Sequence, residues 1–182
     1  YYDFSENLKL IVSNRFYNQK MDNVAIIDSE NYKGDAKENE WDSQIKLEQK
    51  WNSKLYSEYE LYATNYKNDS FLNDENNVLY DKTYYNQWLF RPEVRTTLAI
   101  NDNKLTAGIG LNYETLDRTY FDENVKFNSQ YVFLQYDYNP TQKWNILVGF
   151  RYDNHSEYAS QFSPKLALNY KISDNFSLKG SV

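Results

Sequence analysis

The sequence of 182 residues has no cysteine, one histidine, three prolines and five glycines. The absence of cysteine excludes a disulfide framework and thiol chemistry. No run of about 18 or more apolar residues is present, so no α-helix of this chain is expected to span a membrane. The net charge of −6 argues against a nucleic-acid partner, which needs a basic surface to meet the phosphates. The folds that remain have neither covalent cross-links nor a helical membrane anchor.

The sequence also lacks the common patterns of enzyme active sites. It has no glycine-rich phosphate loop and no strand–turn–helix context for a nucleophilic serine. Glu58 and Glu60 share one strand face, where they are interpreted as charges on a wet surface rather than as a glycosidase pair. The acidic segment 68–77 does not follow the calcium-loop pattern and is interpreted as a solvated loop. We therefore expect no enzyme activity, no cofactor and no resident metal.

The chain is rich in aromatic rings, above all in its 19 tyrosines, which argues against a disordered chain. Apolar and polar residues alternate with a period of two, the pattern of a strand with two different faces. Between residues 41 and 51, one parity reads Trp41, Ser43, Ile45, Leu47, Gln49 and Trp51, and the other reads Asp42, Gln44, Lys46, Glu48 and Lys50. The alternation recurs in residues 105–114, 144–153 and 165–172, and more weakly in 8–16, 55–66, 88–100 and 130–138.

Short and long connections alternate along the chain. The short ones are rich in Asn, Asp and Ser and are predicted to be hairpin turns, at residues 52–54, 101–104, 139–142 and 173–175. The longer polar stretches, predicted to be loops, cover residues 18–38, 67–86, 117–129 and 154–162. The strands between them run to about 10 to 14 residues, which is long for a soluble sheet. The sequence therefore predicts an all-β fold, an antiparallel up-and-down transmembrane β-barrel, with eight strands and a truncated ninth beginning at Phe176.

Aromatic residues lie near both ends of the predicted strands, as in the girdles of membrane barrels. Trp51, Trp144 and Phe176 adjoin short turns. Those near the long loops are Tyr84, Tyr85, Trp88, Tyr120, Phe121 and Tyr131. The alternative is that these rings pack a β core. Pro92 removes a ladder hydrogen bond, so it is expected above the membrane or at a bulge.

The parity opposite the apolar one carries charges of both signs. These residues are Lys46, Glu48, Glu58, Glu60, Arg91, Glu93, Arg95, Arg151, Asp153 and Lys165. In a barrel they face the wet interior, where they pair with each other, with water or with another domain. In a soluble sandwich the same residues form an ordinary solvated face. Strand length and loop asymmetry favour the barrel.

The last part of the chain resembles the barrel of TonB-dependent outer-membrane receptors. Residues 144–182 read "WNILVGFRYDNHSEYASQFSPKLALNYKISDNFSLKGSV". They contain a G-x-R-Y-D strand end at 149–153, and a Ser-Pro-Lys strand start at 163–165 that is similar to the family's s-P-[KR]-x-a. Residues 129–144, "SQYVFLQYDYNPTQKW", resemble the family's preceding strand. In the family a further strand usually continues where this chain is cut, at Val182.

The resemblance implies a fold and a function. Family barrels have about 22 strands around an N-terminal plug, so residues 1–182 are expected to be a section of one barrel domain, without the plug and the remaining strands. The implied function is uptake of a scarce nutrient, a ferric siderophore, haem, cobalamin or a glycan, across the outer membrane of a Gram-negative bacterium. The implied partners are outer-membrane lipid, the TonB complex through the missing plug, and a small-molecule ligand at extracellular loops. The Asn-, Lys- and Tyr-rich composition is similar to that of Bacteroidetes receptors.

Candidate ligand-binding residues combine aromatic rings with arginines on the long loops and the upper inner wall. They are Tyr84, Tyr85, Arg91, Arg118 and Arg151, because rings stack and guanidinium groups pair with anionic groups. The alternative is that they are girdle and wall residues. His155 is a weak candidate for metal or haem ligation, since a single histidine in a loop is usually solvated.

Two other functions fit parts of the pattern. A complete eight-stranded outer-membrane barrel, serving as an anchor or adhesin, has the right chain length, but it would end on a whole strand. A soluble all-β carbohydrate-binding domain would keep the alternation as an ordinary core, and would remain monodisperse without detergent.

Overall fold

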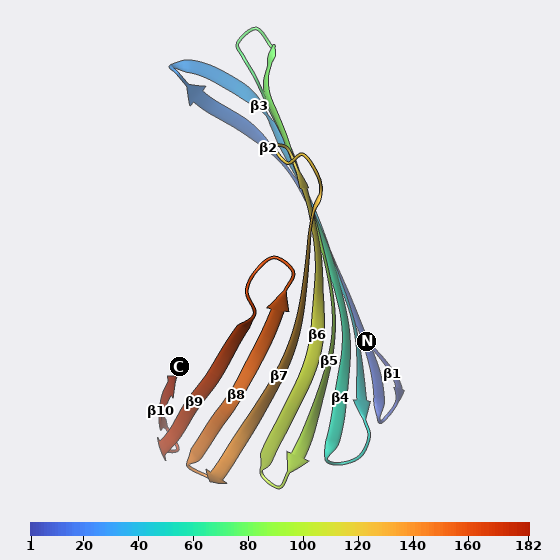
Figure 1. Cartoon of the computed structure of the whole chain (residues 1–182), viewed down its shortest axis with the longest axis vertical. Coiled ribbons are helices and arrows are strands. Elements are labelled where there is room, and N and C mark those ends of the chain that lie inside the picture. The colour runs from blue at the N-terminus through green and yellow to red at the C-terminus, as the bar shows by residue number, and fades with distance from the viewer.

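The computed structural model describes all of residues 1–182 and contains ten antiparallel strands in one sheet. Each strand pairs with the next along the chain, in the order β1 to β10 (Figure 1). The bounds are β1 Tyr2–Ser5, β2 Leu8–Ile27, β3 Glu30–Lys50, β4 Leu55–Asn73, β5 Leu79–Ile100, β6 Asn103–Arg118, β7 Val125–Thr141, β8 Trp144–His155, β9 Gln161–Ser173 and β10 Phe176–Ser181. The chain holds no helix with the length and apolar character needed to cross a membrane.

The predicted all-β meander is confirmed, and the sheet is a partial barrel that does not close. The eight predicted full strands correspond to β2–β9, and the strand beginning at Phe176 is β10. The prediction missed β1, because its four residues are too few to display a period. Since β1 and β10 lie at opposite edges of a ten-stranded open sheet, the chain does not form the closed eight-stranded barrel considered as an alternative.

Two of the predicted long loops are wrong. Residues 18–38 form the ends of β2 and β3, and most of residues 67–86 belongs to β4 and β5. The β2–β3 hairpin closes through Asp28 and Ser29, whose φ angles of 51° and 69° suit a tight two-residue turn. Backbone pairing extends these strands although most of the side chains there are polar, with apolar residues mainly near the tips, as in residues 24–27. The hairpins β2–β3 and β4–β5 consequently reach furthest from the short-turn rim (Figure 1).

The strand register places the two parities on opposite faces of the sheet. One continuous row joins Lys46, Glu60, Glu93, Gly110, Tyr131 and Asp153 across six strands. The neighbouring row on the other face joins Leu47, Tyr59, Val94, Ile109, Val132 and Tyr152. All ten charged residues predicted to share one face do so. We call this the polar face, and the opposite one the apolar face.

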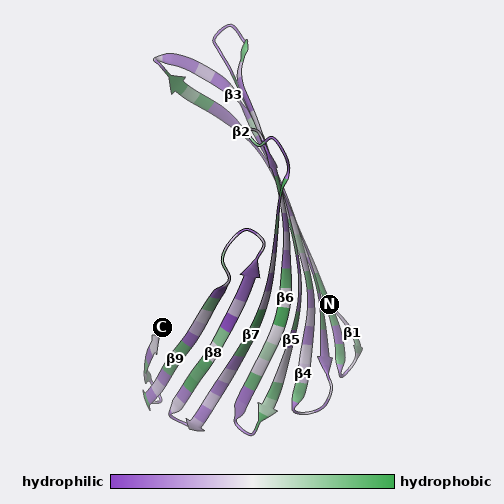
Figure 2. Cartoon of the chain, in the orientation of Figure 1, coloured by the Kyte–Doolittle hydropathy of each residue, from purple (hydrophilic) through white to green (hydrophobic).

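No second layer covers the apolar face. Only 5 of 182 residues are buried, and Val148 and Ile109 remain 50% and 55% exposed. A soluble sandwich would have buried these side chains between two sheets. Figure 2 shows hydrophobic residues distributed along the lower parts of the strands, whereas the extended hairpins are mainly hydrophilic apart from their tips. The apolar side chains therefore form an exposed band rather than a core.

Aromatic pairs border this band, and they include two of the predicted girdle rings, Trp88 and Trp144. Trp41 and Trp88 meet edge to face at 6.0 Å between ring centroids, and Trp144 packs on Tyr170 at 4.5 Å near the short-turn rim. The girdle assignment of Tyr131 is wrong. Tyr131 is 2% exposed and lies on the polar face, in the same row as Glu93. Tyr85 also has polar-face parity, six residues before Arg91 on β5.

Pro92 lies neither beyond the band nor at a bulge, contrary to the prediction. It sits within β5 opposite Leu61 of β4, on the apolar face. Toward β6 the pairing stops at Phe90–Tyr113 and resumes in the same register at Glu93–Gly110. Because proline has no N–H to donate, the ladder skips this position without a register shift.

Candidate functional site

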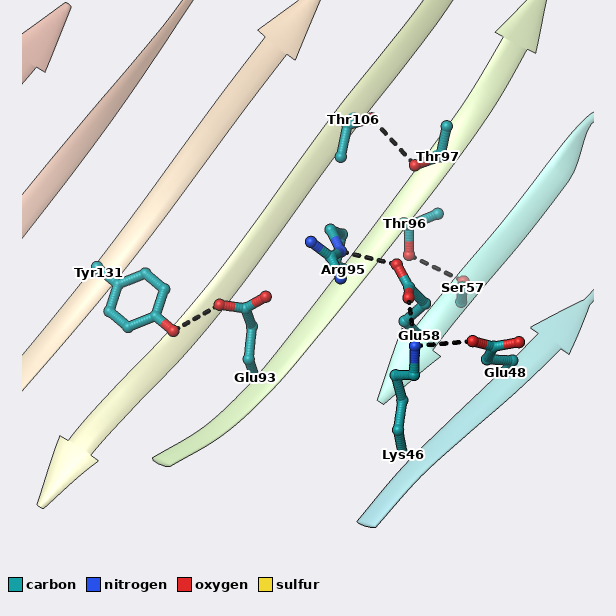
Figure 3. Close-up of polar contacts among 10 residues, drawn as sticks. All are labelled: Lys46, Glu48, Ser57, Glu58, Glu93, Arg95, Thr96, Thr97, Thr106 and Tyr131. Carbon is teal, nitrogen blue, oxygen red and sulfur yellow. Dashed lines mark hydrogen bonds and ion pairs between the residues drawn. The ribbon is translucent and has the colours of Figure 1, made fainter. Parts of the chain in front are cut away.

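The polar face carries a network of charged side chains that begins on β3, β4 and β5. Lys46 Nζ lies 2.8 Å from Glu48 Oε1 and 3.5 Å from Glu58 Oε1, and Arg95 Nε donates to Glu58 Oε2 at 2.8 Å (Figure 3). The register explains the contacts, because Glu58 lies opposite Glu48 on one side and Arg95 on the other. Glu58 thus accepts from two cations across three strands, and its side chain is only 15% exposed.

A second cluster joins β5, β7 and β8. The phenol of Tyr131 donates to Glu93 Oε2 at 2.6 Å, as Figure 3 shows. The guanidinium of Arg151 lies 3.8 Å from the centroid of the Tyr131 ring and binds Asp153 through Nε and Nη2 at 2.7 to 3.0 Å. The cluster depends on Gly110 of β6, because a Cβ there would lie 2.3 Å from Tyr131 Cζ.

A third cluster lies nearer the extended hairpins, on β2–β5. Arg15 Nε donates to Asp42 Oδ2 at 2.6 Å, and the Tyr62 phenol donates to Asp42 Oδ1 at 3.0 Å. Arg15 also pairs with Glu40. Arg91 lies 5.0 Å from the centroid of the Tyr62 ring, and its Nη2 is 3.4 Å from Glu60 Oε1. The Nε of Arg91 is buried and has no hydrogen-bond partner.

The charges on this face compensate one another within the wall. Of the ten predicted polar-face charges, Lys46, Arg91, Arg95, Arg151 and Lys165 are positive, and Glu48, Glu58, Glu60, Glu93 and Asp153 are negative. All of them except Glu93 and Lys165 form ion pairs, and Glu93 accepts a hydrogen bond from the phenol of Tyr131. The arrangement offers a polar, nearly neutral surface with donors and acceptors. No group of three or more His, Cys, Asp or Glu side chains is placed to hold a metal ion.

The five predicted ligand-binding residues do not form one site. Arg91 and Arg151 lie on the polar face and flank the Tyr131–Glu93 contact. Tyr85 is directly opposite Arg118 at the distal ends of β5 and β6. Tyr84 has the other parity and donates through its phenol to Asp117 Oδ1 at 2.6 Å. The structure thus places Arg91 and Arg151 on the polar face within the sheet, and Tyr85 and Arg118 at the distal ends of their strands. Tyr84 lies on the opposite, apolar face.

His155 ends β8 in an aromatic environment. Its ring centroid lies 4.7 Å from that of Tyr158 and 5.9 Å from that of Phe127. Its Nδ1 accepts a hydrogen bond from the backbone N–H of Glu157 at 3.1 Å. This contact assigns His155 a role in shaping the β8–β9 connection.

Sequence reasoning missed Tyr131 and Arg15 as wall residues. Tyr131 was assigned by its nearness to a loop, although its parity follows Phe133 and Gln135 on β7. The glycines Gly108 and Gly110 were a usable signal, because a pair of glycines on one face leaves room for rings from the next strand. Arg15 lay in a segment whose weak alternation gave no clear face.

The hairpins that extend beyond the third cluster carry tyrosines bound to carboxylates. Tyr66 packs on Tyr85 at 5.7 Å and donates to Glu38. Tyr32 packs on Tyr80 in a tilted arrangement, with 4.1 Å between ring centroids, and its phenol donates to Glu30 Oε2 at 3.0 Å. The hydrogen bond to Glu30, together with burial of the phenol, raises the pKa of Tyr32 to about 12.

Comparison with known proteins agrees with this geometry. The family model described as "TonB dependent receptor-like, beta-barrel" matches residues 1–182. The crystal structure of the siderophore receptor PirA from Acinetobacter baumannii superposes with a TM-score of 0.64 at 14% identity, over 95% of this chain and 33% of that receptor. PirA from Pseudomonas aeruginosa gives a TM-score of 0.52 at 14% identity, over 92% of this chain and 38% of that receptor. At such identity the likeness concerns the fold alone. This chain spans 33% and 38% of the two receptors, and no curated protein matches its sequence.

Proposed function

This chain belongs to the TonB-dependent receptor β-barrel family, and from that membership we propose that it forms part of the wall of a nutrient importer. The importer lies in the outer membrane of a Gram-negative bacterium and is powered through TonB. Its cargo is a ferric siderophore, haem, cobalamin or a glycan. It binds the cargo without chemical change, as expected for a receptor of this family.

The observation that carries this proposal is the contrast between the two faces. The apolar face is exposed and bordered by aromatic pairs, which suits contact with hydrocarbon and with the lipid–water boundaries. The polar face compensates its own charges and suits a water-filled interior. In this arrangement the short turns face the periplasm, and the extended β2–β3 and β4–β5 hairpins face the outside.

Ligand contacts are proposed at two heights of the wall. Tyr85 and Arg118 meet the incoming ligand beyond the membrane, and Tyr84 borders the same region from the other side of β5. Arg91 and Arg151 contact it within the barrel. Aromatic rings and guanidinium groups together bind polar ligands by stacking and by directed hydrogen bonds.

A growth experiment tests the function. A strain lacking the gene is compared with the wild type on single sources of iron, cobalamin or glycan, with the intact gene restored as the control. The proposal expects a defect on one class of nutrient, and rescue only when TonB is functional. Normal growth on every source, or recovery of the protein from the soluble fraction, would contradict it.

A further inference from the structure

A groove of about 490 Å³ lies on the apolar face and follows β5. Its floor is formed by the short side chains of Pro92 and Val94. The register gives it two rims, since Pro92 lies opposite Leu61 of β4, and Val94 lies between Tyr59 of β4 and Ile109 of β6. The groove is therefore one strand wide, with longer side chains standing on both sides of it.

The lining of this groove is almost wholly hydrocarbon. Glu60 and Glu93 border it through their backbone only, because their side chains project to the polar face. There Glu60 pairs with Arg91, and Glu93 accepts the hydrogen bond from Tyr131. The groove thus has no charged side chain with which to hold a polar or ionic ligand, and its occupant must be apolar.

The groove lies at the middle of the apolar band. Along β5, Val94 is six residues from Trp88, which forms the aromatic pair with Trp41, and six residues from Ile100 at the short-turn rim. Each distance is about 20 Å along the strand. The groove is therefore remote from both lipid–water boundaries, at the depth where a membrane consists of acyl chains.

The width of the groove favours a single acyl chain over another protein. The rims on β4 and β6 are about 10 Å apart, since each strand is one spacing from β5. A transmembrane helix is as wide as this with its side chains, and helices approach closely only where small side chains line the contact. The rims here carry Leu61, Tyr59, Ile109 and Leu111, so a helix would rest on them and leave the floor empty.

We propose that this groove binds one acyl chain of a membrane lipid, which lies along β5 over Pro92 and Val94. No hydrophobic driving force distinguishes the groove from the surrounding hydrocarbon, so the chain is held by dispersion contacts with the floor and both rims. A chain on the rest of the band touches one surface only. The proposal rests on the proposed function, because that function places the apolar face in lipid.

The test uses the full-length protein in phosphatidylcholine vesicles that contain a lipid with a photoactivatable diazirine at the middle of one acyl chain. After irradiation, mass spectrometry of the peptides counts the adducts on each strand. We expect residues 92–96 of β5 to carry about tenfold more adducts than residues 130–134 of β7, which the register places at the same depth. Val94→Trp fills the floor and should abolish this enrichment.

The matched control is Val132→Trp. Val132 belongs to the same row as Val94 and is 42% exposed against 39%, but it does not line the groove. The two variants have the same composition, so differences in side-chain reactivity cancel, and the control should keep the enrichment on β5. If Val94→Trp does not insert into vesicles, the distribution of adducts on the wild type still decides the question.

Three results would overturn the proposal. They are even labelling of β5 and β7, equal enrichment in the two variants, and fewer adducts on β5 than on β7, which would show that a protein covers the groove. Absence of adducts from the whole apolar face would overturn the proposed function as well. If β5 is enriched as expected while the growth experiment fails, only the transport function is refuted.

Discussion

Tyr131 on β7 donates a hydrogen bond of 2.6 Å to Glu93 on β5, although β6 lies between the two strands. The contact passes over Gly110, which pairs with Glu93 on one side and Tyr131 on the other. Because Gly110 has no side chain, the ring lies flat enough on the sheet to reach the carboxylate. Three strands are thereby tied together on the polar face.

Adding a methyl group at this crossing should destabilise the wall. In Gly110→Ala the new Cβ would lie 2.3 Å from Tyr131 Cζ, so the ring must move away from Glu93. We expect the free energy of unfolding to fall by about 1 to 3 kcal/mol, measured by urea denaturation of the protein in detergent micelles. Gly180→Ala is the control, since no atom lies within 4 Å of its added Cβ. Equal stability of the two variants would refute the crossing contact.

Removing the Tyr131 hydroxyl tests the hydrogen bond separately from the packing. Tyr131→Phe keeps the ring beneath Arg151 but leaves the half-buried Glu93 without its donor. The expected loss of stability is about 1 to 3 kcal/mol, measured by the same denaturation. Tyr152→Phe, on the apolar face and 42% exposed, should change stability by less than about 0.5 kcal/mol. If Tyr131→Phe reduced the free energy of unfolding as little as Tyr152→Phe does, the hydrogen bond from the phenol to Glu93 would not contribute to stability.

The ion pair between Glu58 and Arg95 should be coupled more strongly than an exposed pair. Glu58 is 15% exposed and Arg95 37%, whereas the Lys20–Asp35 pair on the outer hairpin is 67% and 34% exposed. Double-mutant cycles with Gln and Met replacements should give above about 1 kcal/mol for Glu58–Arg95 and below about 0.5 kcal/mol for Lys20–Asp35. Comparable coupling energies would mean that water screens the polar face as it does the outer hairpin.

The phenol of Tyr32 should lose its proton at a higher pH than an ordinary tyrosine. Its pKa is raised from the ordinary 10.0 to about 12, first by the hydrogen bond to Glu30 and then by burial. Since the folded-state pKa is the higher one, this stabilising contribution is complete below pH 10 and is lost as the pH rises through about 12. The tyrosinate absorbance of the wild type minus that of Tyr32→Phe should show a midpoint near 12. A midpoint near 10 would show that Tyr32 is not hydrogen-bonded to Glu30.

The two faces were predictable from the sequence because a period of two needs no knowledge of the partner strand. All ten polar-face charges were assigned correctly, and so were the short turns that begin at Asn52 and near Ser173. Hairpin length was not predictable in the same way. Residues 18–27 are held as a strand by backbone pairing with β3. Residues 18–23 are mostly polar and residues 24–27 are all apolar, so no alternation reveals the strand.

The candidate site was predictable only in part, for a related physical reason. Parity assigns Arg91 and Arg151 to the polar face, but it does not say which residues meet across the sheet. The meeting of Tyr131 with Glu93 depends on the register of three strands and on the gap at Gly110. The orphaned Nε of Arg91 likewise follows from its neighbours on β4 rather than from its own segment.

The central claim is that the apolar face meets hydrocarbon and the polar face meets water, and single cysteines along β8 test it most directly. Residues 1–182 contain no cysteine, and any cysteine elsewhere in the full-length protein is first replaced by serine, so that each introduced label is unique. Spin labels at Ile146, Val148, Phe150 and Tyr152 of the full-length protein in lipid vesicles should be accessible to oxygen and shielded from a water-soluble nickel complex. Labels at Asn145, Leu147, Gly149 and Arg151 should show the reverse. Similar nickel accessibility at both parities, or exclusion of both reagents from the first set, would contradict a lipid-facing wall.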